Sequence, residues 1–208
     1  ANTEDNILSM GGTDTIPDPS IPSVSISSSS GAIIRDALNG GQVNLTIEVP
    51  QYLDSGFDNG VIAHEYAHGI SNRLTGGPSE AFCLFNDEQM GEGWSDYFGT
   101  VMTIEPGDVG TDARPMGTYL FGQGPNGNGI RPFPYSTDFG VNPMTYATIG
   151  SGVSVPHGVG SVWATMLWDM TWALIDEYGF DPDLYNGTGG NNMAMELVIE
   201  GLKLQPCG

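Results

Sequence analysis

The sequence predicts an α+β protein that is mainly helical and carries a small β-α-β segment before its helices. Gly accounts for 31 of the 208 residues and Pro for 14, which favours long, tightly turned loops over a compact all-helical bundle. After residue 57, several stretches place apolar residues at helical spacing. Residues 42–49, QVNLTIEV, instead alternate apolar and polar residues, as a half-buried strand does.

The first 50 residues account for the β-α-β segment. A short strand is expected at 22–27, PSVSIS, and a short helix at 31–38, GAIIRDAL, which NGG stops. The strand at 42–49 completes the pattern. We interpret the serine run at 27–30 as a loop that leads into the helix.

The rest of the chain is expected to be helical, with one long irregular region. Helices are predicted over 58–74, 87–103, 157–179 and 191–203. The third is apolar nearly all round, so it should be buried. Residues 105–156 are rich in Gly and Pro and should be irregular.

The charge of the chain excludes some classes of partner. The formal net charge is −20 at pH 7, and such a surface repels phosphate, so we expect no nucleic-acid partner. Anionic membranes are disfavoured for the same reason, and no apolar run is long enough to span a bilayer. The first ten residues lack the basic start of a signal peptide, so we expect a mature chain or a piece of one.

The stretch VIAHEYAH at 61–68 predicts a metal site. On a helix, His64 and His68 lie on one face, one turn apart, and their rings can bind one ion. Glu65 can reach a water on that ion but not the ion itself, which is the pattern of a zinc hydrolase. In the alternative, both histidines are partly buried core residues and Glu65 faces solvent. An acid inside so apolar a run argues against that alternative.

The stretch GEGWSD at 91–96 predicts the third ligand. Glu92 lies on the next expected helix and supplies a carboxylate. Asp96 follows four residues later on the same helix face. It can accept the outer N–H of a ligating histidine and so fix the orientation of the ring.

Four stretches closely resemble the fungalysin family of secreted zinc metallopeptidases, particularly its bacterial members. They are FDNGVIAHEYAHGISNRLTGGP, QMGEGWSDYFG, GIRPFPYSTD and VPHGVGSVWATMLWDMTWALIDEYG. These peptidases belong with the thermolysin-like gluzincins, in which a glutamate on the next helix is the third zinc ligand. The resemblance covers roughly residues 55 to 207 and implies a thermolysin-like catalytic fold with one zinc ion per chain.

The resemblance also implies a role for individual residues. His64, His68 and Glu92 match the zinc ligands, Glu65 the catalytic base, and Asp96 the acid behind the ligands.

Two further roles are less specific. His157, in VPHGVG, resembles the histidine that stabilises the oxyanion formed when a peptide bond is attacked; a capping or core histidine is the alternative. Arg131, in GIRPFPYS, resembles the arginine that binds a substrate carbonyl, and pairing with loop acids is the alternative. Tyr135 and Tyr146 are both candidates to line the cleft, and the sequence does not choose between them.

Residues 1–50 resemble the C-terminal part of a protease-associated domain, on the basis of IPSVSIS, a short helix and VNLT. The alternative is a β-rich edge of the peptidase itself. Residues 51–208 are then the catalytic region, which could be incomplete, because residues 1–57 do not resemble the sheet that precedes the HExxH helix in thermolysin-like peptidases.

The predicted function is a secreted zinc endopeptidase that acts on proteins or peptides, with Glu65 as general base. The alternative is an inactive metal-binding fragment or binding module of a longer peptidase, whose partners would include other segments of the same precursor.

Two smaller questions stay open. Cys83 and Cys207 could form one disulfide in an extracellular chain or remain buried thiols in a cytosolic one. The acidic loop at 180–192, FDPDLYNGTGGNN, raises Ca²⁺ as an additional metal, although no calcium-loop spacing is present.

Overall fold

The computed structural model describes residues 28–44, 53–85 and 90–207. The chain divides into two compact units, Ala1–Val49 and Pro50–Gly208.

In the first unit, the described residues form one helix, α1 (Ser28–Asn39). This confirms the helix predicted at 31–38 and extends it backwards. The serines at 28–30 form its first turn, so interpreting them as a loop was wrong. Both predicted strands lie outside the described residues, apart from 42–44, which are not in a strand. The β-α-β segment is therefore not shown.

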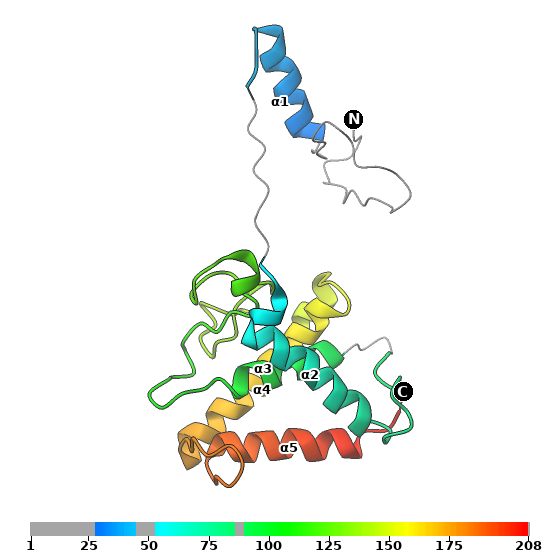
Figure 1. Ribbon diagram of the computed structural model, residues 1–208, viewed down its shortest axis with the longest axis vertical. Coiled ribbons are helices and arrows are strands. Elements are labelled where there is room, and N and C mark those ends of the chain that lie inside the picture. The colour runs from blue at the N-terminus through cyan, green and yellow to red at the C-terminus, as the bar shows by residue number, and fades with distance from the viewer. Residues whose placement is uncertain (1–27, 45–52, 86–89, 208) are drawn as a thin grey trace. The chain divides into compact units, whose positions relative to one another are not determined.

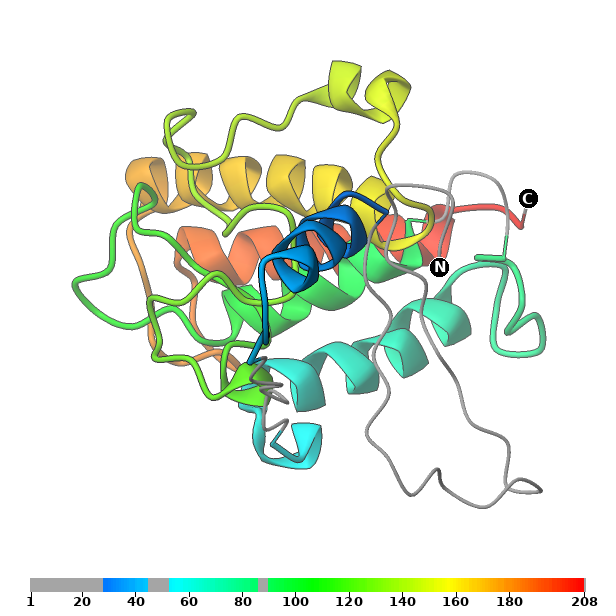
Figure 2. The same ribbon diagram turned by 90° about the horizontal axis from the view of Figure 1, so that it is seen from above.

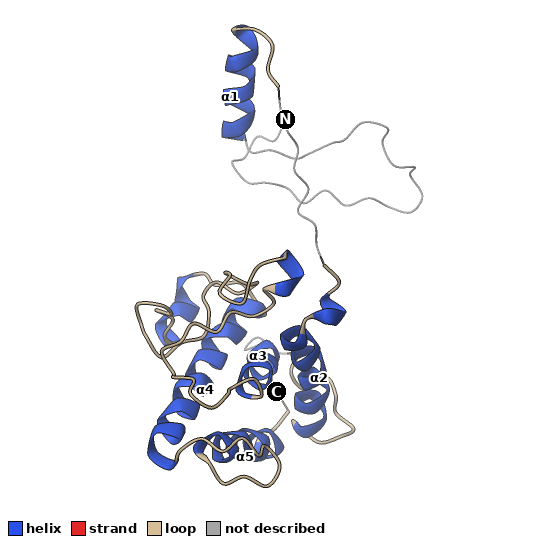
Figure 3. Ribbon diagram, turned by 60° about the vertical axis from the view of Figure 1, so that its left-hand side comes forward, coloured by secondary structure: helices blue, strands red, loops and turns tan. Residues whose placement is uncertain are grey.

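The second unit consists of helices and long loops. It contains, in chain order, η1 (Ser55–Phe57), α2 (Asn59–Leu74), α3 (Gly91–Val101), η2 (Tyr119–Phe121), η3 (Tyr146–Ser151), α4 (His157–Tyr178) and α5 (Gly190–Leu204). Among the described residues, the only strand-like pairing is one antiparallel bridge between Arg114 and Tyr135, and Figure 3 accordingly shows helices and loops. The prediction of a mainly helical fold is confirmed.

Three of the four helices predicted in this unit begin and end close to the expected residues. The helix predicted at 87–103 corresponds to α3, which is shorter than predicted and spans Gly91–Val101. At its carboxyl end, the Thr103 hydroxyl donates to the carbonyl of Thr100 at 2.8 Å. Such local bonds compete with the helical pattern and help to end the helix. Of the residues before it, Met90 lies in a turn, and 86–89 lie outside the described residues.

Asp58 determines where α2 begins. Its Oδ1 accepts the backbone N–H groups of Gly60 at 3.0 Å and Val61 at 3.2 Å, an N-cap that satisfies donors without a helical partner. Its Oδ2 accepts the N–H of Tyr119 at 3.1 Å. One buried carboxylate therefore starts the helix that carries HEYAH and joins it to η2.

The long helices pack in succession, α2 on α3, α3 on α4 and α4 on α5 (Figures 1 and 2). The core lies between α3, α4 and α5. Its largest fully buried side chains include Trp168, Tyr97, Tyr135, Leu202 and Val101. Aromatic rings meet edge to face in it, as in the pair Trp94–Trp163, whose centroids are 5.8 Å apart.

Two glycines allow α3 and α4 to approach closely. A Cβ on Gly93 would lie 2.4 Å from the carbonyl oxygen of Gly160. A Cβ on Gly160 would lie 2.5 Å from the Cβ of Glu92. No side chain fits at either position, so the first turn of α4, which begins at His157, is held close to Glu92.

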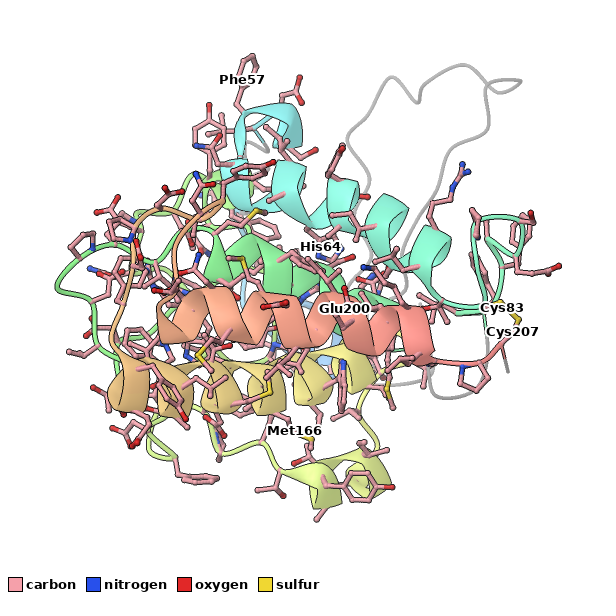
Figure 4. All side chains as sticks on the ribbon, turned by 90° about the horizontal axis from the view of Figure 1, so that it is seen from below. Phe57, His64, Cys83, Met166, Glu200 and Cys207 are labelled. Carbon is pink, nitrogen blue, oxygen red and sulfur yellow. A yellow bond between two sulfur atoms is a disulfide. The ribbon has the colours of Figure 1, made fainter. Side chains whose placement is uncertain are left out.

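A disulfide joins Cys83 to Cys207 (Figure 4). Of the two alternatives left open by the sequence, the structure therefore has the paired one. The bond connects the loop after α2 to the chain that follows α5.

Candidate metal centre

Helices α2 and α3 bring three metal-binding side chains to one point. Nε2 of His64 lies 3.2 Å from Nε2 of His68 and 3.3 Å from Oε2 of Glu92. Nε2 of His68 lies 3.5 Å from Oε1 of Glu92. Within the described ranges, these residues form the one group of at least three His, Cys, Asp or Glu side chains placed to hold a metal ion. Figure 4 shows His64 between the two helices.

The spacing of these atoms fits a zinc ion. Zinc in a tetrahedral site binds nitrogen and carboxylate oxygen at about 2.0–2.2 Å, which places neighbouring ligand atoms about 3.3–3.6 Å apart. The three separations, 3.2, 3.3 and 3.5 Å, lie in or next to that range. Two imidazoles and one carboxylate are also a donor set found in catalytic zinc sites.

Asp96 lies behind the first histidine and is fully buried. Its Oδ1 accepts the Nδ1–H of His64 at 2.7 Å. A proton held on Nδ1 leaves Nε2 with its lone pair directed at the metal position. Arg131 binds the same carboxylate in two places, from Nε to Oδ2 at 2.6 Å and from Nη2 to Oδ1 at 2.8 Å. The Tyr135 hydroxyl donates to Oδ2.

Both carboxylates are held in the ionised form. Burial alone would raise the pKa of Asp96, but hydrogen bonds from His64 and Arg131 outweigh it and keep that pKa below its usual range. Burial also acts to raise the pKa of Glu92, and the hydrogen bond with His64 and the nearby histidine charges lower it. Two negative charges therefore lie at the site, and Arg131 pairs with both of them.

The two histidines differ in how readily they take a proton. Burial lowers the pKa of His64, but hydrogen bonds with Asp96 and Glu92 more than compensate and raise it to about 9. Burial and the charge on His64 lower the pKa of His68. In the metal-free protein, a proton on His64 thus neutralises part of the negative charge, and protons compete with a metal for this site.

A cavity of about 190 Å³ opens beside the three side chains. Glu65 lines it from an exposed position on α2, and His157 lines it from the start of α4 with its side chain 57% exposed. Nε2 of His157 lies 3.5 Å from Oε2 of Glu92. Both residues that the sequence assigns to catalysis are thus at the rim of one cavity, whose remaining lining residues are Val61, His64, His68, Glu92, Met116, Ile130 and Arg131.

Arg131 is more deeply engaged than the resemblance implies. Its side chain is only 6% exposed, and Nη2 also lies 3.3 Å from Oε2 of Glu92. The acids that it pairs with belong to the site itself, namely Glu92 and Asp96, rather than to distant loops. It nevertheless lines the cavity.

The sequence did not identify three other residues that help to build this site, one tyrosine and two glycines. Of the two candidate tyrosines, Tyr146 is 75% exposed on η3, whereas Tyr135 is buried behind Asp96. Tyr135 lies in an irregular loop, where no periodicity indicates its direction. Gly93 and Gly160 could not be distinguished from the many other glycines, since their role depends on contact between two helices.

The geometry defines a class of site. An HExxH helix facing a glutamate on the next helix, with an acid behind the first histidine, is the arrangement of a metallopeptidase centre. Residues 41–208 match the family described as Fungalysin metallopeptidase (M36). The chain belongs to this family.

Relatives with this similarity are named extracellular metalloproteinases. The chain is 43% identical over 168 residues to "Extracellular metalloproteinase mep" of Aspergillus fumigatus (strain CBS 144.89 / FGSC A1163 / CEA10), covering 77% of this chain and 26% of the relative. It is 44% identical over 162 residues to "Extracellular metalloproteinase 2" of Arthroderma gypseum, covering 74% and 25%. To "Extracellular metalloproteinase MEP" of Fusarium vanettenii it is 45% identical over 163 residues, with the same coverage. The chain therefore spans about a quarter of the length of these relatives.

Proposed function

We propose that this chain forms the catalytic region of a secreted, zinc-dependent endopeptidase that hydrolyses peptide bonds in proteins or peptides. The observation that carries the proposal is the convergence of His64, His68 and Glu92 at separations of 3.2–3.5 Å. These three would hold one zinc ion per chain, and Asp96 would orient His64. Family membership and the names of the relatives support the same activity.

The residues at the rim of the cavity would carry out the proton transfers. Bound zinc would polarise the scissile carbonyl and lower the pKa of a water in its open position. Glu65 would accept a proton from that water at its carboxylate and deliver it to the leaving amine. The half-exposed ring of His157 would donate a hydrogen bond to the oxygen on which negative charge develops. Arg131 lines the same cavity, so a contact with a substrate carbonyl stays part of the proposal.

Calcium receives no support from the acidic loop. The oxygens of Asp181 accept the backbone N–H groups of Asp183 at 3.0 Å and Thr188 at 3.1 Å. Asp183 in turn accepts from Tyr185 at 3.0 Å and Asn186 at 2.9 Å. These carboxylates close the turns of their own loop, and we include no calcium ion in the proposal.

Secretion is part of the proposal because the relatives are named as extracellular proteins and a disulfide joins Cys83 to Cys207. No helix in the described parts of the chain combines the length and apolar character needed to cross a membrane. The narrower predictions, a bacterial type and a protease-associated tail at 1–50, stay predictions. The three relatives are fungal, and the family match already includes residues 41–50.

Replacing Glu65 by Gln tests the proposal, because Gln keeps the shape of the side chain but cannot accept the proton. We expect one zinc per chain in both proteins and a loss of casein cleavage of about 10²–10⁴-fold in Glu65→Gln. The exposed Glu196 on α5 supplies the matched control, Glu196→Gln, which should cleave at the parent rate.

Each outcome of that assay has a distinct meaning. If Glu65→Gln cleaves casein as fast as the parent, the assignment of the base is wrong. If the zinc-loaded parent shows no casein cleavage that is sensitive to a chelator, the chain is a metal-binding module and not an active peptidase by itself.

A further inference from the structure

We propose that Tyr135 is a positioning residue for the zinc ligand His64, and that it acts through Asp96. The inference rests on the proposed function, since it concerns the metal that this function requires. Neither the spacing of the motif nor the resemblance assigns a role to this tyrosine.

The structure holds Tyr135 at both ends. Its backbone N–H donates to the carbonyl of Arg114 at 2.9 Å, and its carbonyl accepts the N–H of Arg114 at 2.9 Å. The ring is 1% exposed and belongs to the hydrophobic core beside α3 and α4. Its hydroxyl donates to Oδ2 of Asp96. A side chain fixed in this way can restrain the group that it contacts.

The hydroxyl completes the set of donors around Asp96. Oδ1 accepts from His64 at 2.7 Å and from Nη2 of Arg131 at 2.8 Å, while Oδ2 accepts from Nε of Arg131 at 2.6 Å and from Tyr135. A carboxylate offers about four lone-pair positions, so all of them are used. With every position occupied, the carboxylate cannot turn, and Oδ1 remains directed at Nδ1 of His64.

Tyr135 is suited to donate and not to accept in this contact. Burial and the neighbouring charge of Asp96 hold the pKa of its hydroxyl far above the usual range. It therefore keeps its proton at neutral pH. Without that donor, Oδ2 would keep one partner, and a buried acceptor position would be left unsatisfied.

The expected consequence is weaker metal binding. Outer partners of a metal-ligating histidine typically change metal affinity by about 10–100-fold when they are removed. Tyr135 is separated from His64 by one more hydrogen bond than Asp96 is. We therefore expect its removal to weaken metal affinity by about 10-fold, the lower end of that range.

Tyr97 supplies a matched control. It is 0% exposed in the same core, and its hydroxyl accepts only a long contact, 3.5 Å, from the Thr171 hydroxyl. Tyr97→Phe thus removes the same atom from a similar environment without touching Asp96. Any effect of simply losing a buried hydroxyl should appear in both variants.

The experiment measures zinc affinity by competition with a chelator, using the full chain. Tyr135→Phe should weaken zinc binding by about 10-fold, and Tyr97→Phe by less than about twofold. Each is then combined with Asp96→Asn. If Tyr135 acts through Asp96, Tyr135→Phe has no further effect in that background, because contacting residues show non-additive effects. An equal loss in both backgrounds would show a merely structural role and overturn the inference.

A measurement on the parent protein covers the case in which Tyr135→Phe does not fold. With ring-labelled tyrosine, the Tyr135 hydroxyl proton should give a resolved NMR signal that shifts when zinc is added, whereas the signal of Tyr97 should not move. An unchanged Tyr135 signal, or a Tyr135→Phe variant that binds zinc as tightly as the parent, overturns this inference alone. A parent that binds no zinc overturns the proposed function together with it.

Discussion

The two faces of α3 are built in opposite ways. Toward α2, the helix presents the partly buried Glu92 and the fully buried Asp96, carboxylates that contact histidines and an arginine. Toward α4, it presents Gly93, where the backbones are so close that no side chain fits. One face is held by directional polar contacts, and the other by apolar packing in which the two backbones come close at Gly93.

The difference separates orientation from distance. Hydrogen bonds to Asp96 determine how the ring of His64 is turned, because they act at particular atoms and angles. The contact between Gly93 and Gly160 determines how near α4 comes, because close-packed backbones resist compression. The two constraints meet at Glu92, which binds His64 on one side and touches Gly160 with its Cβ on the other. The candidate metal position and His157, the proposed oxyanion donor, are thereby placed relative to each other.

The largest effect should come from breaking the close contact. Gly160→Ala would place a Cβ 2.5 Å from the Cβ of Glu92 and 2.7 Å from the backbone nitrogen of Gly93. Neither atom can move without shifting a helix, so we expect a loss of about 3 kcal/mol in the free energy of unfolding, measured by urea denaturation. Zinc affinity should fall too, because Glu92 is displaced. An unchanged urea midpoint would show that the helices are not held by this contact.

The polar face should respond to pH in the metal-free protein. The pKa of His64 is about 9 in the folded chain, against an ordinary value of 6.5. Its raised pKa contributes stability that is complete below pH 6.5 and is lost as the pH rises through 9. The loss should be on the order of 2–3 kcal/mol, seen as a lower melting temperature at pH 9.5 than at pH 6 in a chelator.

Zinc should reverse this trend. A metal requires neutral imidazoles, so its affinity rises as His64 loses its proton. Thermal unfolding of the zinc-loaded protein should therefore show a stabilisation by zinc that grows from pH 6 to pH 9.5. Metal-free protein that becomes more stable over the same range would contradict the assignment of the raised pKa to His64.

The contrast between the two faces also explains what the sequence could predict. His64 and His68 lie on one helix, and Glu92 and Asp96 lie on another. Helical geometry alone therefore places the members of each pair on the same helix face. The helices at 58–74 and 157–179 follow from local periodicity in the same way. The helix of the third ligand is less closely predicted, since Met90 lies in a turn and α3 begins at Gly91.

Contacts between segments far apart in the chain could not be predicted from local spacing. Tyr135 reaches Asp96 from a loop 39 residues further along the chain, and no local pattern indicates where a loop side chain points. Gly93 and Gly160 matter only because two helices meet there. Arg131 could be assigned a partner only by analogy, and the structure places it on the site's own acids. Local spacing thus predicted the three candidate ligands that the structure brings together, whereas the contacts that support them depend on tertiary packing.

The smallest expected effect has the opposite sign and uses the same amino-acid exchange. Gly201 lies within α5, and a Cβ built on it meets no heavy atom within 4 Å. Gly201→Ala should therefore raise the free energy of unfolding by about 0.5–1 kcal/mol, because alanine favours the helix and restricts the unfolded chain. In a chain of this size, that corresponds to a rise of about 1–4 °C in the melting temperature. If Gly201→Ala instead destabilises the protein as much as Gly160→Ala, the cost at Gly160 does not come from the close approach of α3 and α4, and the distinction between the two faces of α3 fails.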